Sequence, residues 1–233
     1  MPLSVHYHRR RVQEEILDEL PFGVITRNRA GCEILNVQSV MFVDWDIDLR
    51  AHLKTQVRGW LTRIRQALRG VSRAELELAT RECKQLRYQA LRDQLQDLKS
   101  ISARLYETHS GFRGIIISSL FDPTDDLSQD LLHVLGSDPL YARLCKVQGT
   151  FRARLTPKHW RLKLPKPFLE RHRSGFTPTV RAGWLEQYTQ SSRNRAVCRF
   201  VAQFGTDATE PSIQAVIALH DARTRAFEAL ELA

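Results

Sequence analysis

Two aspartates at the end of one apolar segment are the residues best suited to chemistry. Asp44 and Asp46 follow the apolar residues 40–43. Alternate side chains of a β-strand point to the same face, so the two carboxylates would lie side by side and repel each other. Mg²⁺ or Mn²⁺ between them would remove that repulsion and could bridge to substrate phosphates. The pattern therefore predicts a divalent-metal site, with Asp48 as a further member or as a helix cap. The alternative is a strand end whose carboxylates are simply solvated.

A second candidate is the glycine turn at His109, Ser110 and Gly111, which Arg113 follows two residues later. Backbone N–H groups, a hydroxyl and a guanidinium are all phosphate donors, and here they lie within a few residues of one another. The turn therefore predicts a phosphate contact. An ordinary hairpin with a polar tip would have the same residues.

Positive charge concentrates in residues 151–173, where Glu170 is the single acid. Aromatic side chains lie between the cations of this stretch, a mixture that grips a nucleic-acid backbone while stacking its bases. A solvated basic face is the alternative. The residues that we expect to contact nucleotide or nucleic acid here are Arg152, Arg154, Lys158, Trp160 and Arg161.

The whole chain has 233 residues and a formal charge of +9, most of it from arginine. Arginine binds phosphate through a planar fork of donors, so the charge favours polyanionic partners. A genome-wide bias toward arginine would give the same overall charge. The hydrophobic content of 42% and charged content of 26% are typical of a globular protein, and we expect one domain.

The elements that position these residues follow from apolar spacing. We expect a helix over residues 9–20, ended by Pro21, and then a meander of three strands over residues 22–26, 32–37 and 39–46. The two aspartates would then end the third strand.

Beyond the meander, two helices are expected over residues 53–68 and 72–98, the second begun by a Ser72/Glu75 capping box. A hairpin over residues 103–118 follows, and its second arm, rich in isoleucine, is predicted to be a central strand. The remaining expectations are short helices over residues 127–135 and 139–147, a strand over 150–155, helices over 181–189 and 213–230, and a helix or a strand over 196–204.

The four cysteines lie far apart without metal-site spacing, so we expect buried thiols. Residues 1–15 carry no apolar stretch that would form a secretory signal or a membrane anchor. A cytoplasmic protein without membrane partners is therefore expected.

The order of these features resembles the archaeo-eukaryotic primase superfamily, which includes small primase-polymerases. The resemblance spans about residues 40–161 and consists of an acid-x-acid strand, a helical insertion, a Ser-Gly hairpin and a basic strand. It implies that Asp44 and Asp46 bind catalytic metal. The family's Ser-x-His motif is nearest to Ser110–Arg113, with Arg113 in the place of histidine. For the third, acidic motif the nearest residue is Asp122.

The resemblance implies a metal-dependent nucleotidyltransferase that acts on nucleic acid and nucleoside triphosphates in replication, repair or a mobile element. Partner proteins would supply what so short a chain lacks. It also implies an α+β fold in which a mixed or antiparallel sheet forms a palm like that of RNA-recognition domains. Residues 1–175 would form the core, and residues 176–233 a mainly helical extension. Two alternatives stay open, a non-catalytic RNA- or DNA-binding module and a metal-dependent nuclease.

Overall fold

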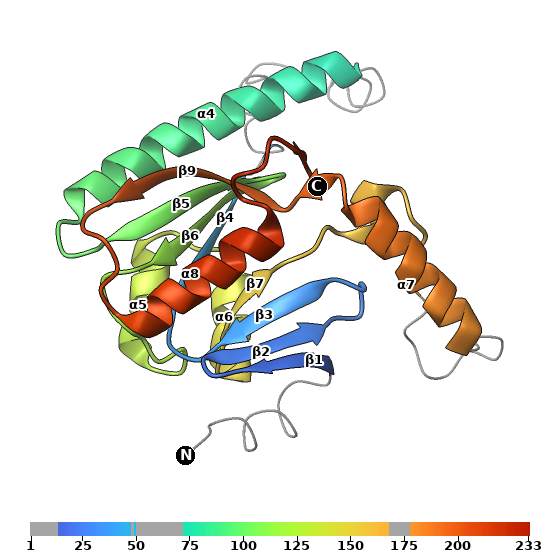
Figure 1. Cartoon of the computed structure of the whole chain (residues 1–233). Helices are drawn as coiled ribbons and strands as arrows, with labels where there is room; N and C mark the ends of the chain where they lie inside the picture. Colours follow the sequence, from blue (N-terminus) through green and yellow to red (C-terminus); the bar gives the residue numbers. More distant parts are fainter. Residues whose placement is uncertain (1–13, 48, 50–71, 168–177) are drawn as a thin grey trace.

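A computed structural model describes residues 14–47, 49, 72–167 and 178–233 (Figure 1). Within these ranges the chain is α+β, with antiparallel sheets and helices around them, which confirms the expected fold class. The likeness of one sheet to an RNA-recognition palm stays a prediction.

The first sheet has four antiparallel strands in the order β1-β2-β3-β7. Its strands are β1 (Glu15–Leu20), β2 (Gly23–Arg27), β3 (Glu33–Val37) and β7 (Phe151–Arg154). The turn between β2 and β3 forms as expected, because the Asn28 side chain accepts the N–H groups of Ala30 and Cys32. The last strand, β7, arrives from a distant part of the sequence and brings the basic segment beside β3.

The second sheet also has four antiparallel strands, in the order β4-β6-β5-β9. They are β4 (Phe42–Asp46), β6 (Gly111–Ile116), β5 (Ala103–Thr108) and β9 (Cys198–Phe204). Every residue of β6 is buried, so the isoleucine-rich arm is a central strand, as predicted. The segment left open between helix and strand is β9, and it pairs with β5.

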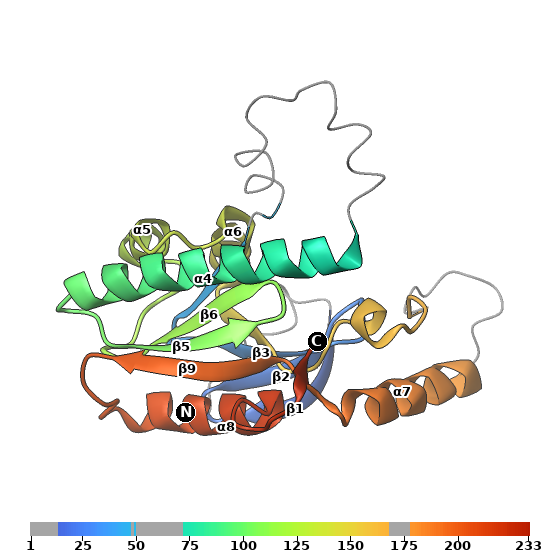
Figure 2. The same ribbon diagram turned by 90° about the horizontal axis from the view of Figure 1, so that it is seen from above.

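Helices cover both faces of the second sheet (Figure 2). One face carries α4 (Arg73–Asp97), α5 (Asp126–Val134) and α6 (Pro139–Gln148), and the other carries α8 (Pro211–Thr224). The predicted capping box starts α4, with Ser72 and Glu75 bonded to each other's backbone. The sheet is therefore buried on both sides, and its chemistry can face solvent only at its ends and edges.

A smaller unit lies beside the first sheet, at the right of Figure 1. It contains α7 (Pro178–Ser192), the 3₁₀ helix η1 (His159–Leu162) and the short parallel pair of β8 (Arg195–Ala196) and β10 (Glu231–Leu232). The hydroxyl of Tyr188 on α7 donates to the Pro157 carbonyl at 2.6 Å. This contact holds α7 against the segment that links β7 to η1.

The predicted helix over residues 9–20 is wrong for the part that the structure describes. Residues 15–20 form β1, an edge strand that pairs with β2, while residues 9–13 lie outside the described ranges. Nearly all of β1 is exposed on both faces, so its residues lack the alternation that identifies a half-buried strand. The spacing of Val12, Ile16 and Leu20 resembled a helix only by coincidence.

Other expectations hold where the structure describes them. The helices at 126–134, 139–148 and 178–192 lie where helices were predicted, and all four cysteines are buried and free. The helix predicted over residues 213–230 forms at 211–224, and residues 225–230 are not helical. The expected helix over residues 53–68 lies outside the described residues.

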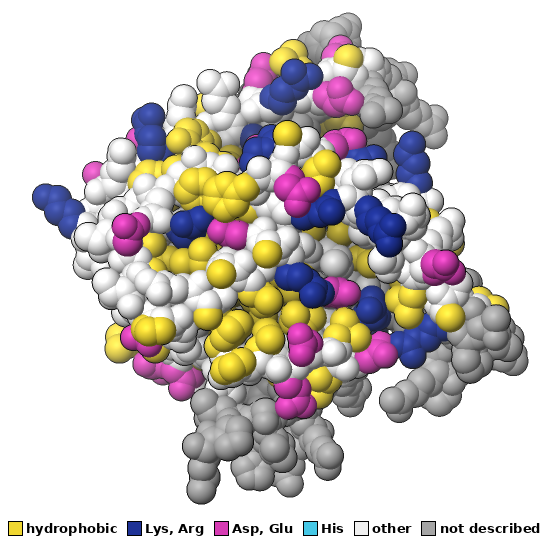
Figure 3. Space-filling view, in the orientation of Figure 1, with side chains coloured by type: hydrophobic (Ala, Val, Ile, Leu, Met, Phe, Trp, Pro, Cys, Tyr) yellow, Lys and Arg dark blue, Asp and Glu magenta, His cyan; other side chains and the backbone are white. Residues whose placement is uncertain are grey.

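The surface carries charges of both signs. In the face of Figure 3, Lys and Arg side chains alternate with Asp and Glu and with apolar patches, and do not form one basic block. Within the described ranges, no helix combines the length and the apolar character that crossing a bilayer requires. Specific clusters, and not the overall charge, must therefore define any anion site.

Candidate functional site

The two aspartates lie on one face at the end of β4, as the strand pattern predicted. Asp44 pairs across the sheet with Arg113, and Asp46 pairs with Gly111. Asp44 is half-buried and Asp46 is exposed, whereas Val43 and Trp45 point to the opposite face and are buried. Burying these apolar side chains fixes the register, so the carboxylates have no other face to occupy. Asp48 lies outside the described residues.

The hairpin tip lies directly beside this strand end. The backbone N–H of Ile47 donates to the Ser110 carbonyl at 3.0 Å. From the other side, the Arg161 guanidinium donates to the Ser110 hydroxyl at 2.5 Å. Ser110 thus joins the aspartate strand to η1, two segments that are more than a hundred residues apart in the sequence.

The cations of the β7–η1 segment act on the two carboxylates. Partial desolvation of the carboxylate, followed by the charge of the neighbouring Asp44, raises the pKa of Asp46, and Lys158 and Arg154 oppose that rise. Burial and the cations Arg154 and Arg161 lower the pKa of Lys158, while Asp46 opposes that change. Two groups of opposite charge therefore lie within electrostatic reach of each other.

Arg161 is a strongly perturbed cation of this segment. Burial, followed by repulsion from Arg154, lowers its pKa to about 10, with Asp46 acting in the opposite direction. Arginine is normally charged far above this pH, so the shift reports a crowded and partly desolvated guanidinium. A bound anion would relieve that crowding.

The two groups do not neutralise each other. Among the described residues, no ion pair within 4.0 Å joins Asp44 or Asp46 to Arg154, Lys158 or Arg161. Two guanidinium nitrogens, Nε of Arg154 and Nη1 of Arg161, are buried without a hydrogen-bond partner in the described structure. A buried donor without an acceptor is costly, and phosphate oxygens are its natural acceptors.

Arg113 lies behind this site and serves a different purpose from the predicted one. Its side chain is 4% exposed, and its Nη1 donates to the Arg154 carbonyl at 3.0 Å and lies 3.3 Å from Nε2 of His220. His220 in turn has Nδ1 at 3.0 Å from the Asp221 carboxylate. The structure thus places Arg113 as a tie between β6, β7 and α8.

Arg152 is also not brought to the site. Its guanidinium is bonded to the Glu14 carboxylate at 2.8 Å and to Gln148. Of the interleaved aromatics, Phe151 is fully buried, and Phe168 lies outside the described residues. Trp160 is 54% exposed, with the Lys158 ammonium 5.1 Å from its ring centroid.

Asp122, the expected third acid, lies at the other end of β4. The neighbouring Phe121 donates its N–H to the Ser39 carbonyl, which precedes the strand, whereas Asp44 and Asp46 end it. The Asp122 carboxylate accepts bonds from the hydroxyl and N–H of Thr124, and these bonds lower its pKa. The structure gives Asp122 the place of a turn residue and does not bring it to the pair.

Two other residues join the site: Asp138, which sequence patterns did not select, and His109, which they placed in the glycine turn beside Ser110. Asp138 donates its N–H to the Asp44 carbonyl at 2.9 Å, and its charge contributes to the raised pKa of Asp46. His109 lies 3.5 Å from the Ser110 hydroxyl, and burial together with Arg161 lowers its pKa. Asp138 precedes a proline and so reads as a helix cap, a role it also fills for α6.

The donor set suits a hard divalent cation. Asp44 and Asp46 are carboxylates on one face. Desolvation and then the repulsion from Asp44 raise the pKa of Asp46, and a cation would oppose that repulsion. Among the residues described, no three His, Cys, Asp or Glu side chains form a ready-made metal cluster. Magnesium sites with one or two carboxylates take their remaining ligands from water and substrate phosphate.

Comparisons with protein-family models, with curated proteins and with solved structures found no match to this chain.

Proposed function

We propose that the end of β4 binds a nucleoside triphosphate with Mg²⁺ or Mn²⁺, and that the chain transfers the nucleotidyl group to a nucleic-acid 3′ hydroxyl. One observation carries the proposal: Asp44 and Asp46 face Arg154, Lys158 and Arg161 closely enough to shift pKa values, but without direct ion pairs. Two nearby groups of opposite charge that do not pair directly favour a ligand that carries both signs, and a metal triphosphate is one.

In the reaction, the hydroxyl oxygen bonds to the α-phosphorus while the bond to the β-phosphate breaks, and pyrophosphate leaves. Arg154, Lys158 and Arg161 would hold the triphosphate and stabilise the charge that grows on its oxygens. Asp44 and Asp46 would hold the metal, which when bound neutralises phosphate charge and lowers the pKa of a coordinated hydroxyl. His109, kept uncharged by its lowered pKa, is an acceptor for the hydroxyl proton near Ser110.

The test is extension of a labelled oligonucleotide with nucleoside triphosphates and Mg²⁺ or Mn²⁺. Asp44→Asn and Asp46→Asn should each lower the rate by about two orders of magnitude or more, the usual scale for losing groups that stabilise charge in the transition state. Asp122→Asn, the matched control, should keep the wild-type rate. Full activity of both site variants would refute the proposal, and cleavage of the oligonucleotide in place of extension would assign a nuclease.

A second candidate is a binding module without catalysis, and the exposure of Trp160 beside Lys158 favours it. An aromatic face next to cations suits single-stranded nucleic acid. In this case oligonucleotide affinity would fall steeply with salt, ignore added Mg²⁺ and survive Asp46→Asn. An affinity independent of salt would exclude it.

A further inference from the structure

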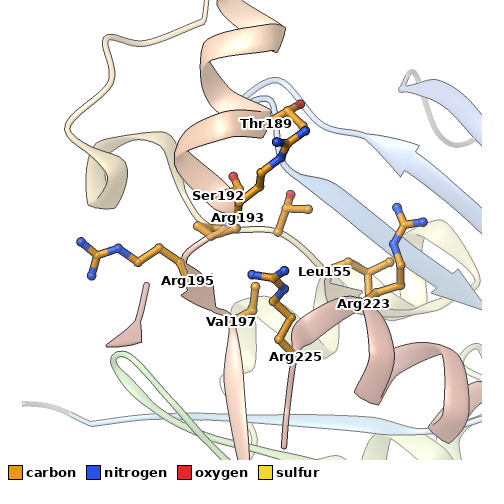
Figure 4. Close-up of a pocket in the computed structure, with 10 residues that line it drawn as sticks. Leu155, Thr189, Ser192, Arg193, Arg195, Val197, Arg223 and Arg225 are labelled. Atoms are coloured by element: carbon orange, nitrogen blue, oxygen red, sulfur yellow. The ribbon is translucent and has the colours of Figure 1, made fainter. Parts of the chain in front are cut away.

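A pocket of about 180 Å³ lies away from the aspartates, where the ends of α7 and α8 meet β8 (Figure 4). Among the described residues, no acidic side chain lines it. Its lining includes three hydroxyl groups, those of Thr156, Thr189 and Ser192, and four arginines from separate parts of the C-terminal region: Arg193, Arg195, Arg223 and Arg225.

The arginines differ in how far their charge is already balanced. Arg195 is paired with Glu231, and Arg223 with Glu33. Arg225 has its Nε 3.5 Å from Glu228 and reaches toward the centre of the pocket, whereas Arg195 points away from it.

The fourth arginine, Arg193, forms no ion pair with any described residue and extends toward Thr189. Each guanidinium has five N–H donors, so even a paired arginine retains donors for a second anion. Arg193 and Arg225 are therefore the two side chains best placed to bind one.

Helix dipoles account for part of this arrangement but not for all of it. The C-terminal end of a helix carries partial negative charge, which a nearby cation stabilises. One arginine after each of α7 and α8 would meet that need, yet the structure gathers four around one cavity. The excess favours an external anion.

The size of the pocket limits what that anion is. Sites for whole small molecules usually have volumes of about 300–1,000 Å³, so about 180 Å³ suits a phosphate group better than a complete nucleotide. Arginine forks with hydroxyls match the oxygens of phosphate in particular.

The pocket and the cations of the aspartate site lie on one continuous segment of chain. Thr156 and Pro157 line the pocket, and the flanking residues Arg154 and Lys158 belong to the site. Two residues of extended chain span only about 7 Å, so one ligand strand could touch both sides of this segment.

We propose that the arginine pocket binds the sugar-phosphate backbone of a single-stranded nucleic acid and guides that strand toward Asp44 and Asp46. The part of the inference that directs the strand toward the aspartates rests on the function proposed above. The binding of the strand to the pocket does not depend on catalysis. The ligand chemistry is the phosphodiester, which DNA and RNA share.

The experiment measures the binding of labelled single-stranded DNA and RNA to the full chain without metal or nucleotide. One phosphate contact contributes a slope of about 0.7 to the dependence of log affinity on log salt, which corresponds to about fivefold in affinity at 0.1 M salt. Arg193→Gln and Arg225→Gln should each cause a loss of this size, and the double variant about 25-fold. Arg92→Gln, the same charge change on the exposed face of α4, should leave affinity and slope unchanged.

Melting temperatures of all variants establish that they fold. Wild-type affinity and salt slope in the folded double variant would overturn the inference. It would also fall if inorganic phosphate stabilised the wild type but not the double variant while oligonucleotide affinity stayed the same, because the pocket would then hold a free anion. Binding of the double variant to vesicles of anionic lipid need not change. If the double variant lost affinity for the vesicles but kept its affinity for DNA and RNA, the pocket would be assigned to membranes and the nucleic-acid proposal would be rejected.

Failure of this inference is distinguishable from failure of the proposed function. Pocket-dependent binding without any extension activity would refute the enzyme and keep the pocket. Extension activity that requires Asp44 and Asp46 but is unchanged without Arg193 and Arg225 would keep the enzyme and refute the pocket.

Discussion

Asp44 and Arg113 are direct partners across β4 and β6, yet the Arg113 guanidinium is bonded to the Arg154 carbonyl and lies against His220. Neither forms an ion pair with the other within 4.0 Å. Although the register places the two residues opposite each other, their side chains form no ion pair and have separate roles. Arg113 joins elements of the fold, and the Asp44 carboxylate stays available for a ligand.

Replacing Arg113 should therefore affect folding more than ligand binding. Arg113→Met leaves the Arg154 carbonyl without this donor and removes the contact with His220, and the loss of one buried hydrogen bond costs about 1–3 kcal/mol. We expect the free energy of unfolding, measured with urea, to fall by an amount in this range. The opposite pattern should hold for Lys158→Met, which removes a crowded cation: triphosphate affinity should fall while stability is kept. An Arg113→Met chain of unchanged stability that no longer binds triphosphate would contradict this assignment.

The raised pKa of Asp46 predicts a stability difference that depends on pH. Because the folded pKa lies above the unfolded one, the stabilising contribution of this group is complete below the unfolded pKa, about 3.9, and is lost as pH rises through the folded pKa. Asp46→Asn should therefore melt at a higher temperature than the wild type at pH 7, with no such gain below about pH 3.9. Solvent screening keeps the gain under about 1 kcal/mol, because Asp46 is exposed. A variant less stable than the wild type at pH 7 would contradict the prediction.

Gly111 should not tolerate even a methyl group. A Cβ at this position would lie 2.0 Å from the Trp45 carbonyl oxygen, on backbone that cannot move without breaking the pairing of β4 with β6. Gly111→Ala should cost more than about 2 kcal/mol of stability and also disorder the Asp46 end of the strand. Gly183→Ala is the matched control, since nothing lies within 4 Å of its added Cβ on α7, and it should stabilise the chain by about 0.5–1 kcal/mol. Equal melting temperatures for the two variants would disprove the close approach.

Trp160 should contribute to nucleic-acid affinity through base stacking. Loss of one stacked base costs about 1–3 kcal/mol, so Trp160→Ala should weaken oligonucleotide binding by that amount with little change in salt slope. Leu140→Ala removes a side chain that is still more exposed, on α6, and should have no effect. Unchanged affinity of the tryptophan variant would show that its exposed ring contacts no base.

Local sequence signals predicted the parts of the fold that depend on neighbours in the chain. The capping box at Ser72, the asparagine turn before β3 and the glycine hairpin between β5 and β6 each satisfy their own backbone groups within a few residues. The face shared by Asp44 and Asp46 was predictable for the same reason, because strand alternation is local. These elements formed as expected.

Features that depend on distant partners were not predictable from patterns. Arg113 looked like a phosphate ligand, but its partner His220 lies on a helix more than a hundred residues later. Asp138 reached the site only because α6 packs against the end of β4, and β1 became a strand only because β2 supplies its hydrogen bonds. No single-segment pattern contains such information.

The hydrogen bond from Arg113 to the Arg154 carbonyl joins the two sheets. It therefore sets the distance between the two aspartates at the end of β4, in one sheet, and the cations at and after the end of β7, in the other. Coulomb attraction at roughly 5 Å changes by about half a kcal/mol for each ångström of separation at an effective dielectric of about 20. Substitutions where the two sheets meet should therefore change ligand affinity in small steps, although they alter no group that contacts the ligand.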